Sequence, residues 1–221
     1  MIHNKVQIGP WISSVFCAVA LKITAFCKTS FILGSSCAFF SLAPIIVPLS
    51  GMFGGIEGSF VLFAISCIVR LIWSGIFSFH FLAYHIPGLF ASLYLSCSHW
   101  GLRLLPSVLC IVLFLSHPVG LAAGLYSLLW LIPVGIYLIG KKNIFLDALA
   151  STFTAHAVGS VIWLYTMPMM PQAWLALIPI ALVERFTYAL GIVVAYKVLV
   201  TLSVLIENRV VVSPAKSCIS K

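Results

Sequence analysis

The most restrictive feature of the sequence is a series of long apolar stretches that contain very little charge. The longest covers residues 173–206, and two others cover residues 120–140 and 145–167. A membrane-spanning α-helix needs about 20 mostly apolar residues, so each stretch is long enough to cross a bilayer. In hydrocarbon the backbone must be paired within the protein, which leaves helices or closed barrels. The alternating segments typical of an outer-membrane barrel do not occur in the sequence, which therefore predicts helices.

Composition extends this prediction to the whole chain. Hydrophobic residues make up 62% of the 221 residues and charged residues 7%, whereas a soluble domain carries about 25% charged residues. This is too little polar surface to coat a water-soluble globule. We therefore predict one integral membrane domain over residues 1–221. Its fold class is all-α, a polytopic transmembrane bundle of roughly six to eight helices with some broken or short segments.

The net charge of +8 would suggest nucleic-acid binding in a soluble protein. Here the basic residues stand singly or at the ends of apolar stretches, as topology signals and phospholipid contacts do, so we expect membrane lipid and no nucleic acid as partners. The pair Lys141-Lys142 and the basic tail with Arg209 and Lys216 predict the cytoplasmic side. We expect a bacterial inner (plasma) membrane location with both termini cytoplasmic.

Two regions are predicted to interrupt regular helix. Residues 48–59 contain four glycines between two apolar stretches. They form either a turn at the membrane surface or a loop that lines a substrate, because irregular backbone at membrane depth is tolerated only where protein or a cavity covers it. Residues 86–98 and 104–116 are each too short to span upright. They form either two short helices or one longer bent helix.

Ionisable side chains inside apolar stretches cost about 2.5–3.5 kcal/mol for a central Arg, Lys or Asp, so proteins that keep them usually use them. The members of this set are Lys22, Glu57, Arg70, His156, Glu184, Arg185 and Lys197. Three roles are possible for these side chains. The first is a structural ion network that would include Lys22 and Arg70, the second is a ligand site, and the third is a proton relay through His156 and Glu184. Neighbouring helix residues point about 100° apart, so we expect Glu184 and Arg185 to contact different partners.

The stretch around His156 has a polar, small-residue face. Thr152, His156, Gly159 and Ser160 share one side of a helix by their spacing, and this side is expected to face the bundle or a cavity. Trp163 either stacks on a flat ligand or anchors the helix at the interface. The predicted substrate-binding residues are Glu57, Thr152, His156, Trp163, Glu184 and Arg185.

Motifs for enzyme chemistry are missing from the sequence. It has no G-x-S-x-G, H-E-x-x-H, P-loop or dinucleotide fingerprint. Its seven cysteines show no C-x-x-C pair and are expected to be buried free thiols. We therefore expect no enzyme activity, no cofactor and no metal. The alternative is a membrane-embedded enzyme or a haem or redox protein that uses His156, with His117 or His85 as a second haem ligand.

The chain resembles the substrate-binding S components of energy-coupling factor (ECF) transporters. The resemblance lies in its size, its basic cytoplasmic ends, the glycine-rich break at residues 48–55, and small residues in the first helix such as Ser14 and Ala18. It implies a roughly six-helix protein that captures a vitamin or trace solute in a membrane pocket. A transmembrane coupling subunit and ATPases would then drive uptake, since this chain has no nucleotide motif. The expected function is binding and uptake of a small, vitamin-like solute.

Overall fold

The computed structural model describes residues 10–26, 28–31, 39–41, 43–74 and 79–212. These residues form eight α-helices and one 3-10 helix, which confirms the predicted all-α fold class and the helix count. A short antiparallel pair of strands joins α1 to α2. The elements are α1 (Pro10–Phe26), β1 (Lys28–Phe31), β2 (Phe39–Ser41), α2 (Ala43–Ser74), α3 (Phe79–Ser96), α4 (Trp100–Ser116), α5 (Pro118–Ala122), the 3-10 helix η1 (Gly124–Trp130), α6 (Leu131–Ile139), α7 (Ile144–Thr166) and α8 (Pro171–Val212).

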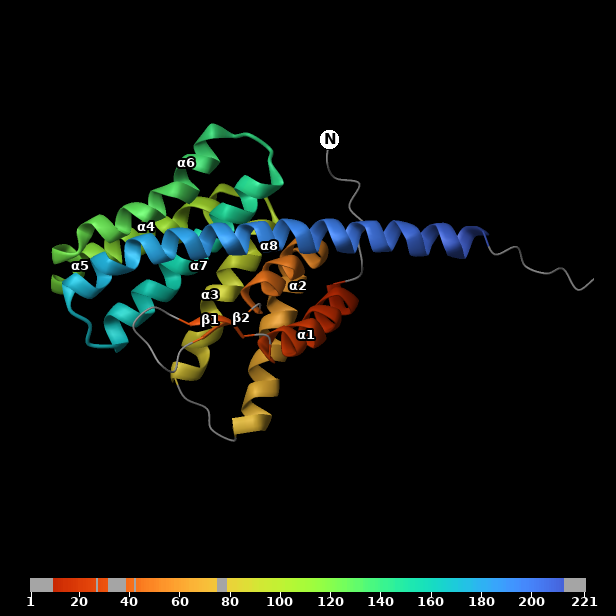
Figure 1. The fold of residues 1–221 in the computed structure, drawn as a ribbon, viewed down its shortest axis with the longest axis horizontal. Coiled ribbons are helices and arrows are strands. Elements are labelled where there is room, and N and C mark those ends of the chain that lie inside the picture. The colour runs from red at the N-terminus through yellow and green to blue at the C-terminus, as the bar shows by residue number, and fades with distance from the viewer. Residues whose placement is uncertain (1–9, 27, 32–38, 42, 75–78, 213–221) are drawn as a thin grey trace, which may run out of the picture.

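Helix α7 is the centre of the bundle. It contacts α3, α4, α6, α8 and η1, and eleven of its residues are buried. Helix α8 lies beside it, runs along the length of the molecule and extends past the other helices (Figure 1). The other half of the molecule contains α1, α2 and α3, which pack on one another. A residue on the inner face of α7 is therefore surrounded by protein on several sides.

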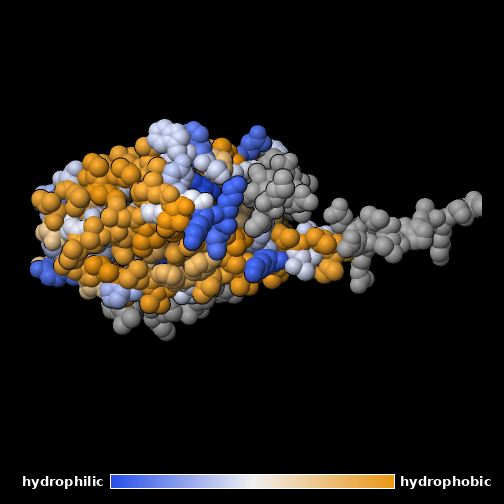
Figure 2. All heavy atoms as spheres, turned by 90° about the horizontal axis from the view of Figure 1, so that it is seen from above, coloured by the Kyte–Doolittle hydropathy of each residue, from blue (hydrophilic) through white to orange (hydrophobic). Residues whose placement is uncertain are grey.

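The described helices fit a bilayer by length and composition. Three of them are long and apolar enough to cross a membrane, and they lie within Pro44–Trp73, Ile144–Thr166 and Pro171–Leu205. Trp100–Ser116 and Gly124–Ile139 are shorter apolar helices. Hydrophobic residues cover most of the described surface in Figure 2, as expected for a protein whose solvent is lipid. The chain is a membrane protein with transmembrane helices.

The glycine-rich region is a kinked helix. Helix α2 covers residues 48–59 but consists of two helical segments that meet at a kink, where Gly55 has φ 64° and ψ −154°, a backbone conformation that glycine adopts without strain. The predicted interruption of regular helix is therefore present as a kink between two helical segments and not as an extended loop. The second uncertain region consists of two helices, because α3 ends at Ser96 and α4 begins at Trp100. The His99 side chain caps α4 by accepting a hydrogen bond from the Gly101 N–H, at 3.2 Å.

The prediction of one spanning helix over residues 120–140 is wrong. This segment is divided among α5, the 3-10 helix η1 and α6. Part of the reason lies at Gly120, where an added Cβ would collide with the Phe114 carbonyl and lie 3.1 Å from Leu164 Cδ2. The absence of a side chain at Gly120 lets α5 lie this close to α4 and to the Leu164 side chain, and the 3-10 helix begins at Gly124. The membrane-embedded part of the bundle therefore contains a broken helix in a place that hydropathy did not reveal.

Candidate functional site

The central helix α7 begins and ends at clear sequence signals. Asn143 caps its N-terminus, since its Oδ1 accepts hydrogen bonds from the N–H groups of Phe145 (2.8 Å) and Leu146 (3.3 Å). The helix ends before Pro168. At 1.5 Å per residue its 23 residues span about 34 Å, close to the thickness of about 30 Å for the hydrocarbon core. His156 lies about 18 Å from the start of the helix, near the middle of the bilayer.

Tyr126 on η1 joins two residues of the predicted polar face of α7. Its hydroxyl lies 2.8 Å from His156 Nε2 and 3.2 Å from Ser160 Oγ. Tyr126 is 1% exposed and Ser160 is buried, while His156 is partly buried. The three side chains form a hydrogen-bonded group between α7 and the broken segment. Tyr126 was not among the residues predicted for the site, because the helix break that brings it there is not visible in hydropathy.

Thr152 connects the same face of α7 to α8. Its hydroxyl donates to the Leu149 carbonyl at 2.8 Å and lies 3.3 Å from the carbonyl oxygen of Arg185. The Arg185 side chain lies over the Tyr188 ring, with Cζ 5.0 Å from the ring centroid. Thr152 therefore links the face of α7 that also carries His156 to α8 at Arg185.

Glu184 and Arg185 form an ion pair with each other, with Oε2 and Nη2 2.6 Å apart. The expectation that they contact different partners is therefore wrong. Their long side chains bend together although their Cα–Cβ bonds point in different directions. Both are mostly buried, with exposed side-chain fractions of 15% for Glu184 and 12% for Arg185. Pairing lowers the cost of burying each charge.

The other predicted residues lie outside this group. Trp163 is 56% exposed on the outer side of α7. Glu57 is exposed on α2 and forms no ion pair with a described residue. Lys22 on α1 and Arg70 on α2 also have exposed side chains. Of the six predicted binding residues, the structure brings together Thr152, His156, Glu184 and Arg185.

Four aromatic side chains from three elements pack beside the hydrogen-bonded group. The Phe114 ring on α4 contacts Trp130 edge-on, with centroids 5.0 Å apart, and Trp174 at 5.4 Å. The Tyr126 ring contacts the same two indoles at 5.9 and 5.1 Å. We call Phe114, Tyr126, Trp130 and Trp174 the aromatic cluster. All four are fully or nearly fully buried, so together they form one wall of the region around His156.

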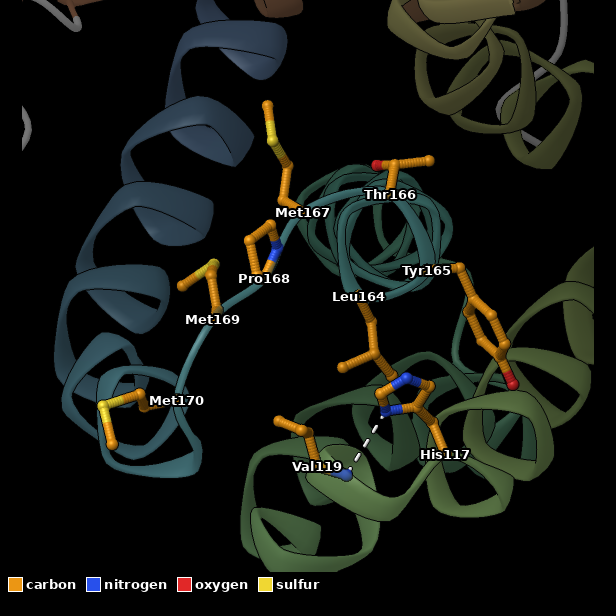
Figure 3. A pocket seen from close by; sticks show the side chains of 9 residues that line it. All are labelled: His117, Val119, Leu164, Tyr165, Thr166, Met167, Pro168, Met169 and Met170. Carbon is orange, nitrogen blue, oxygen red and sulfur yellow. Dashed lines mark hydrogen bonds between the residues drawn. The ribbon is translucent and has the colours of Figure 1, made fainter.

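An open cavity of about 500 Å³ lies where α4 and α5 meet the turn between α7 and α8 (Figure 3). His117, Leu164, Tyr165 and residues 166–170 line most of it. The His117 Nδ1 accepts a hydrogen bond from the Val119 N–H at 3.2 Å, so the neutral ring carries its proton on Nε2. Neither nitrogen then has a free lone pair, so this arrangement does not suit His117 as a metal or haem ligand.

Metal-binding residues do not cluster in the described part of the chain. It contains no group of three or more His, Cys, Asp or Glu side chains that could hold a metal ion. Four of the cysteines, Cys17, Cys67, Cys97 and Cys110, are described, and all are free thiols, as predicted. Of these four, only Cys17 and Cys110 are also buried, as expected, whereas Cys67 and Cys97 are partly exposed. Between α7 and α8 the structure shows hydrogen bonding and charge pairing. Such a region can bind and orient a solute.

Comparison with known proteins gives no relative. No protein-family model matches the chain, and no curated protein or solved structure is significantly similar to it.

Proposed function

We propose that this protein binds a small solute inside the bilayer and takes part in its uptake. The observation that carries the proposal is the mostly buried Glu184–Arg185 pair, whose helix is joined at Arg185 to the polar face of α7 through Thr152. Intramembrane ionisable residues usually mark substrate or ion pathways. Arg185 would hold an anionic or hydrogen-bond-accepting group of the solute. Glu184 would bind a cationic or hydrogen-bond-donating group.

The broken segment from α5 to α6 supports a transport role. Transporter sites commonly lie near the bilayer midplane, next to discontinuous helices that can move. Here η1 is a 3-10 segment between two short α-helices, and it carries Tyr126 to His156 on α7. Runs of 3-10 helix inside a longer helix often mark functional hinges. A small movement of η1 would open or close this side of the site.

The resemblance to ECF S components gives this proposal its partners. A chain without a nucleotide motif needs an external source of energy for uptake. A transmembrane coupling subunit with its ATPases would supply it, and the solute would be vitamin-sized. We propose a binding subunit rather than an enzyme, since the sequence contains none of the catalytic motifs searched for.

Native mass spectrometry of the detergent-purified protein tests the proposal. We expect a co-purifying small molecule that is lost in Arg185→Ala and in Glu184→Ala, while both variants still insert into the membrane. Lys197→Ala is the matched control, because Lys197 lies on the same helix with an exposed side chain. Retention of the same mass by both site variants would refute the proposal. A Soret absorption band in the purified protein would instead favour the haem alternative.

A further inference from the structure

Two indole N–H groups in the aromatic cluster have no hydrogen-bond acceptor among the described residues. They are Trp130 Nε1 on η1 and Trp174 Nε1 on α8. Trp130 is 0% exposed and Trp174 is 2% exposed. An indole N–H is a donor only, and buried Trp residues normally find a partner for it. Two unpaired donors in contact with the same Tyr126 ring are therefore unusual for a purely structural core.

The unpaired donors adjoin the proposed solute site. The Tyr126 ring contacts both indoles, and its hydroxyl lies at hydrogen-bond distance from His156. Arg185 adds a third buried donor without a partner, its Nε. All three unsatisfied groups in this region are thus N–H donors. None of these three donors has an acceptor among the described residues.

The open cavity and the aromatic cluster share a neighbour in the buried core. Leu164 lines the open cavity (Figure 3) and belongs to the same buried core as Tyr126 and Trp174. Met170, at the edge of the cavity, lies one helical turn before Trp174 in the chain. A solute that enters there would meet the aromatic cluster before it reaches Arg185.

In edge-to-face packing, an indole N–H group can contact the face of a neighbouring aromatic ring in place of a hydrogen-bond acceptor. The Trp130 ring is nearly perpendicular to the Phe114 ring, at 88°, and to the Tyr126 ring, at 83°. The ring of Trp174 is at 83° to Phe114. Contacts between an N–H group and an aromatic face are real but weaker than a bond to an oxygen. They would leave both donors available to a stronger acceptor.

We infer that the solute carries a carbonyl or carboxylate oxygen that accepts hydrogen bonds from Trp130 and Trp174. This inference rests on the proposed function and adds the chemical class of the solute. Oxygen acceptors match all three unpaired N–H groups, whereas an ammonium group brings only further donors. Trp130 and Trp174 are then binding residues, in addition to Arg185.

The test compares three probes that share a benzene ring, namely benzoate, benzamide and benzylammonium. Each is titrated into the detergent-purified full chain labelled with ¹⁵N at the Trp indole, and the Nε1–H signals are followed by NMR. Trp130→Phe and Trp174→Phe assign the signals and remove one N–H each while keeping an aromatic ring. Trp163→Phe, on the outer side of α7, is the matched control. The melting temperature of each variant without probe checks that it is folded.

We expect benzoate and benzamide to shift both indole signals downfield, and benzylammonium to leave them unchanged. Each of the two Phe variants should raise the dissociation constant of benzoate about tenfold, and the Trp163→Phe variant should not. Unchanged affinity in folded Trp130→Phe and Trp174→Phe, equal binding of benzylammonium, or no response to any probe would overturn the inference. If those variants also keep a co-purifying solute that Arg185→Ala loses, the proposed function stands and only the solute class is wrong.

Discussion

The two ion pairs found among the described residues are built in different ways. Arg103 on α4 reaches Asp147 on α7 at 2.8 Å across 44 residues of sequence. Its Nε also donates to the Cys97 carbonyl at 3.1 Å, and its guanidinium lies over the Tyr94 ring. This pair lies near the ends of three helices, and both Nε and Nη1 of Arg103 have acceptors. It is an interhelical ion pair that connects α3, α4 and α7.

The Glu184–Arg185 pair joins neighbours on a single helix and ties no two elements together. It lies far from the helix ends, and Arg185 Nε has no acceptor among the described residues. In a membrane, the separated helices are already inserted before they pack. Glu184 and Arg185 can therefore pair in both states, whereas Arg103 and Asp147 meet only in the packed bundle. The comparison suggests stability for the first pair and ligand binding for the second.

The largest loss of stability is expected when the Arg103–Asp147 ion pair is removed. Arg103→Ala should destabilise the bundle by about 3 kcal/mol, because it leaves Asp147 mostly buried without its partner. Unfolding in mixed detergent–SDS micelles measures this loss. The double variant Arg103→Leu/Asp147→Leu should recover most of it, since an apolar pair replaces two charges. A double variant as unstable as Arg103→Ala would show that Arg103 and Asp147 stabilise the bundle by more than their ion pair.

A smaller effect is expected where the broken helix meets α7. Tyr126→Phe removes the hydroxyl that bonds to His156 and Ser160 but keeps the ring in the aromatic cluster. We expect a loss of about 1 kcal/mol in the free energy of unfolding, the usual value for a hydrogen bond. The same unfolding assay measures it. Tyr165→Phe, whose hydroxyl bonds to the Leu113 carbonyl at an exposed position, is the control and should lose less.

The smallest stability effect should come from the pair proposed to bind solute. Glu184→Gln/Arg185→Gln removes both charges, and we expect a change below about 1 kcal/mol, because the pair contributes similarly before and after packing. Solute retention should nevertheless be lost. A stability loss as large as that of Arg103→Ala would break the comparison and assign both pairs the same structural role.

Sequence reasoning succeeded where local pattern decides the structure. The fold class follows from apolar length, and the apolar stretch predicted over residues 145–167 nearly coincides with α7, Ile144–Thr166. The spacing of Thr152, His156 and Ser160 places them on one face, and the structure turns that face towards η1 and α8.

It failed where tertiary contacts decide. Hydropathy is the same for an α-helix and a 3-10 helix, so the break after Gly120 and the arrival of Tyr126 at His156 were not predictable. The angle of about 100° between neighbouring residues on a helix also failed to predict that Glu184 and Arg185 pair. Their long side chains can bend towards each other. The outward position of Trp163 depends on which face of α7 its neighbours cover. Asp147 was missed as a partner of Arg103, although the chain has only four acidic residues and each buried base needs one.

The length of α8 has a consequence for the membrane itself. Its apolar part, Pro171–Leu205, is about 52 Å long at 1.5 Å per residue, against a hydrocarbon core of about 30 Å. To fit entirely within that core the helix would have to tilt by about 55°, beyond the usual range of about 0–40°. Part of its apolar surface must therefore leave the hydrocarbon. Bilayer thickness thus sets how far α8 projects, and a thicker membrane covers more of it.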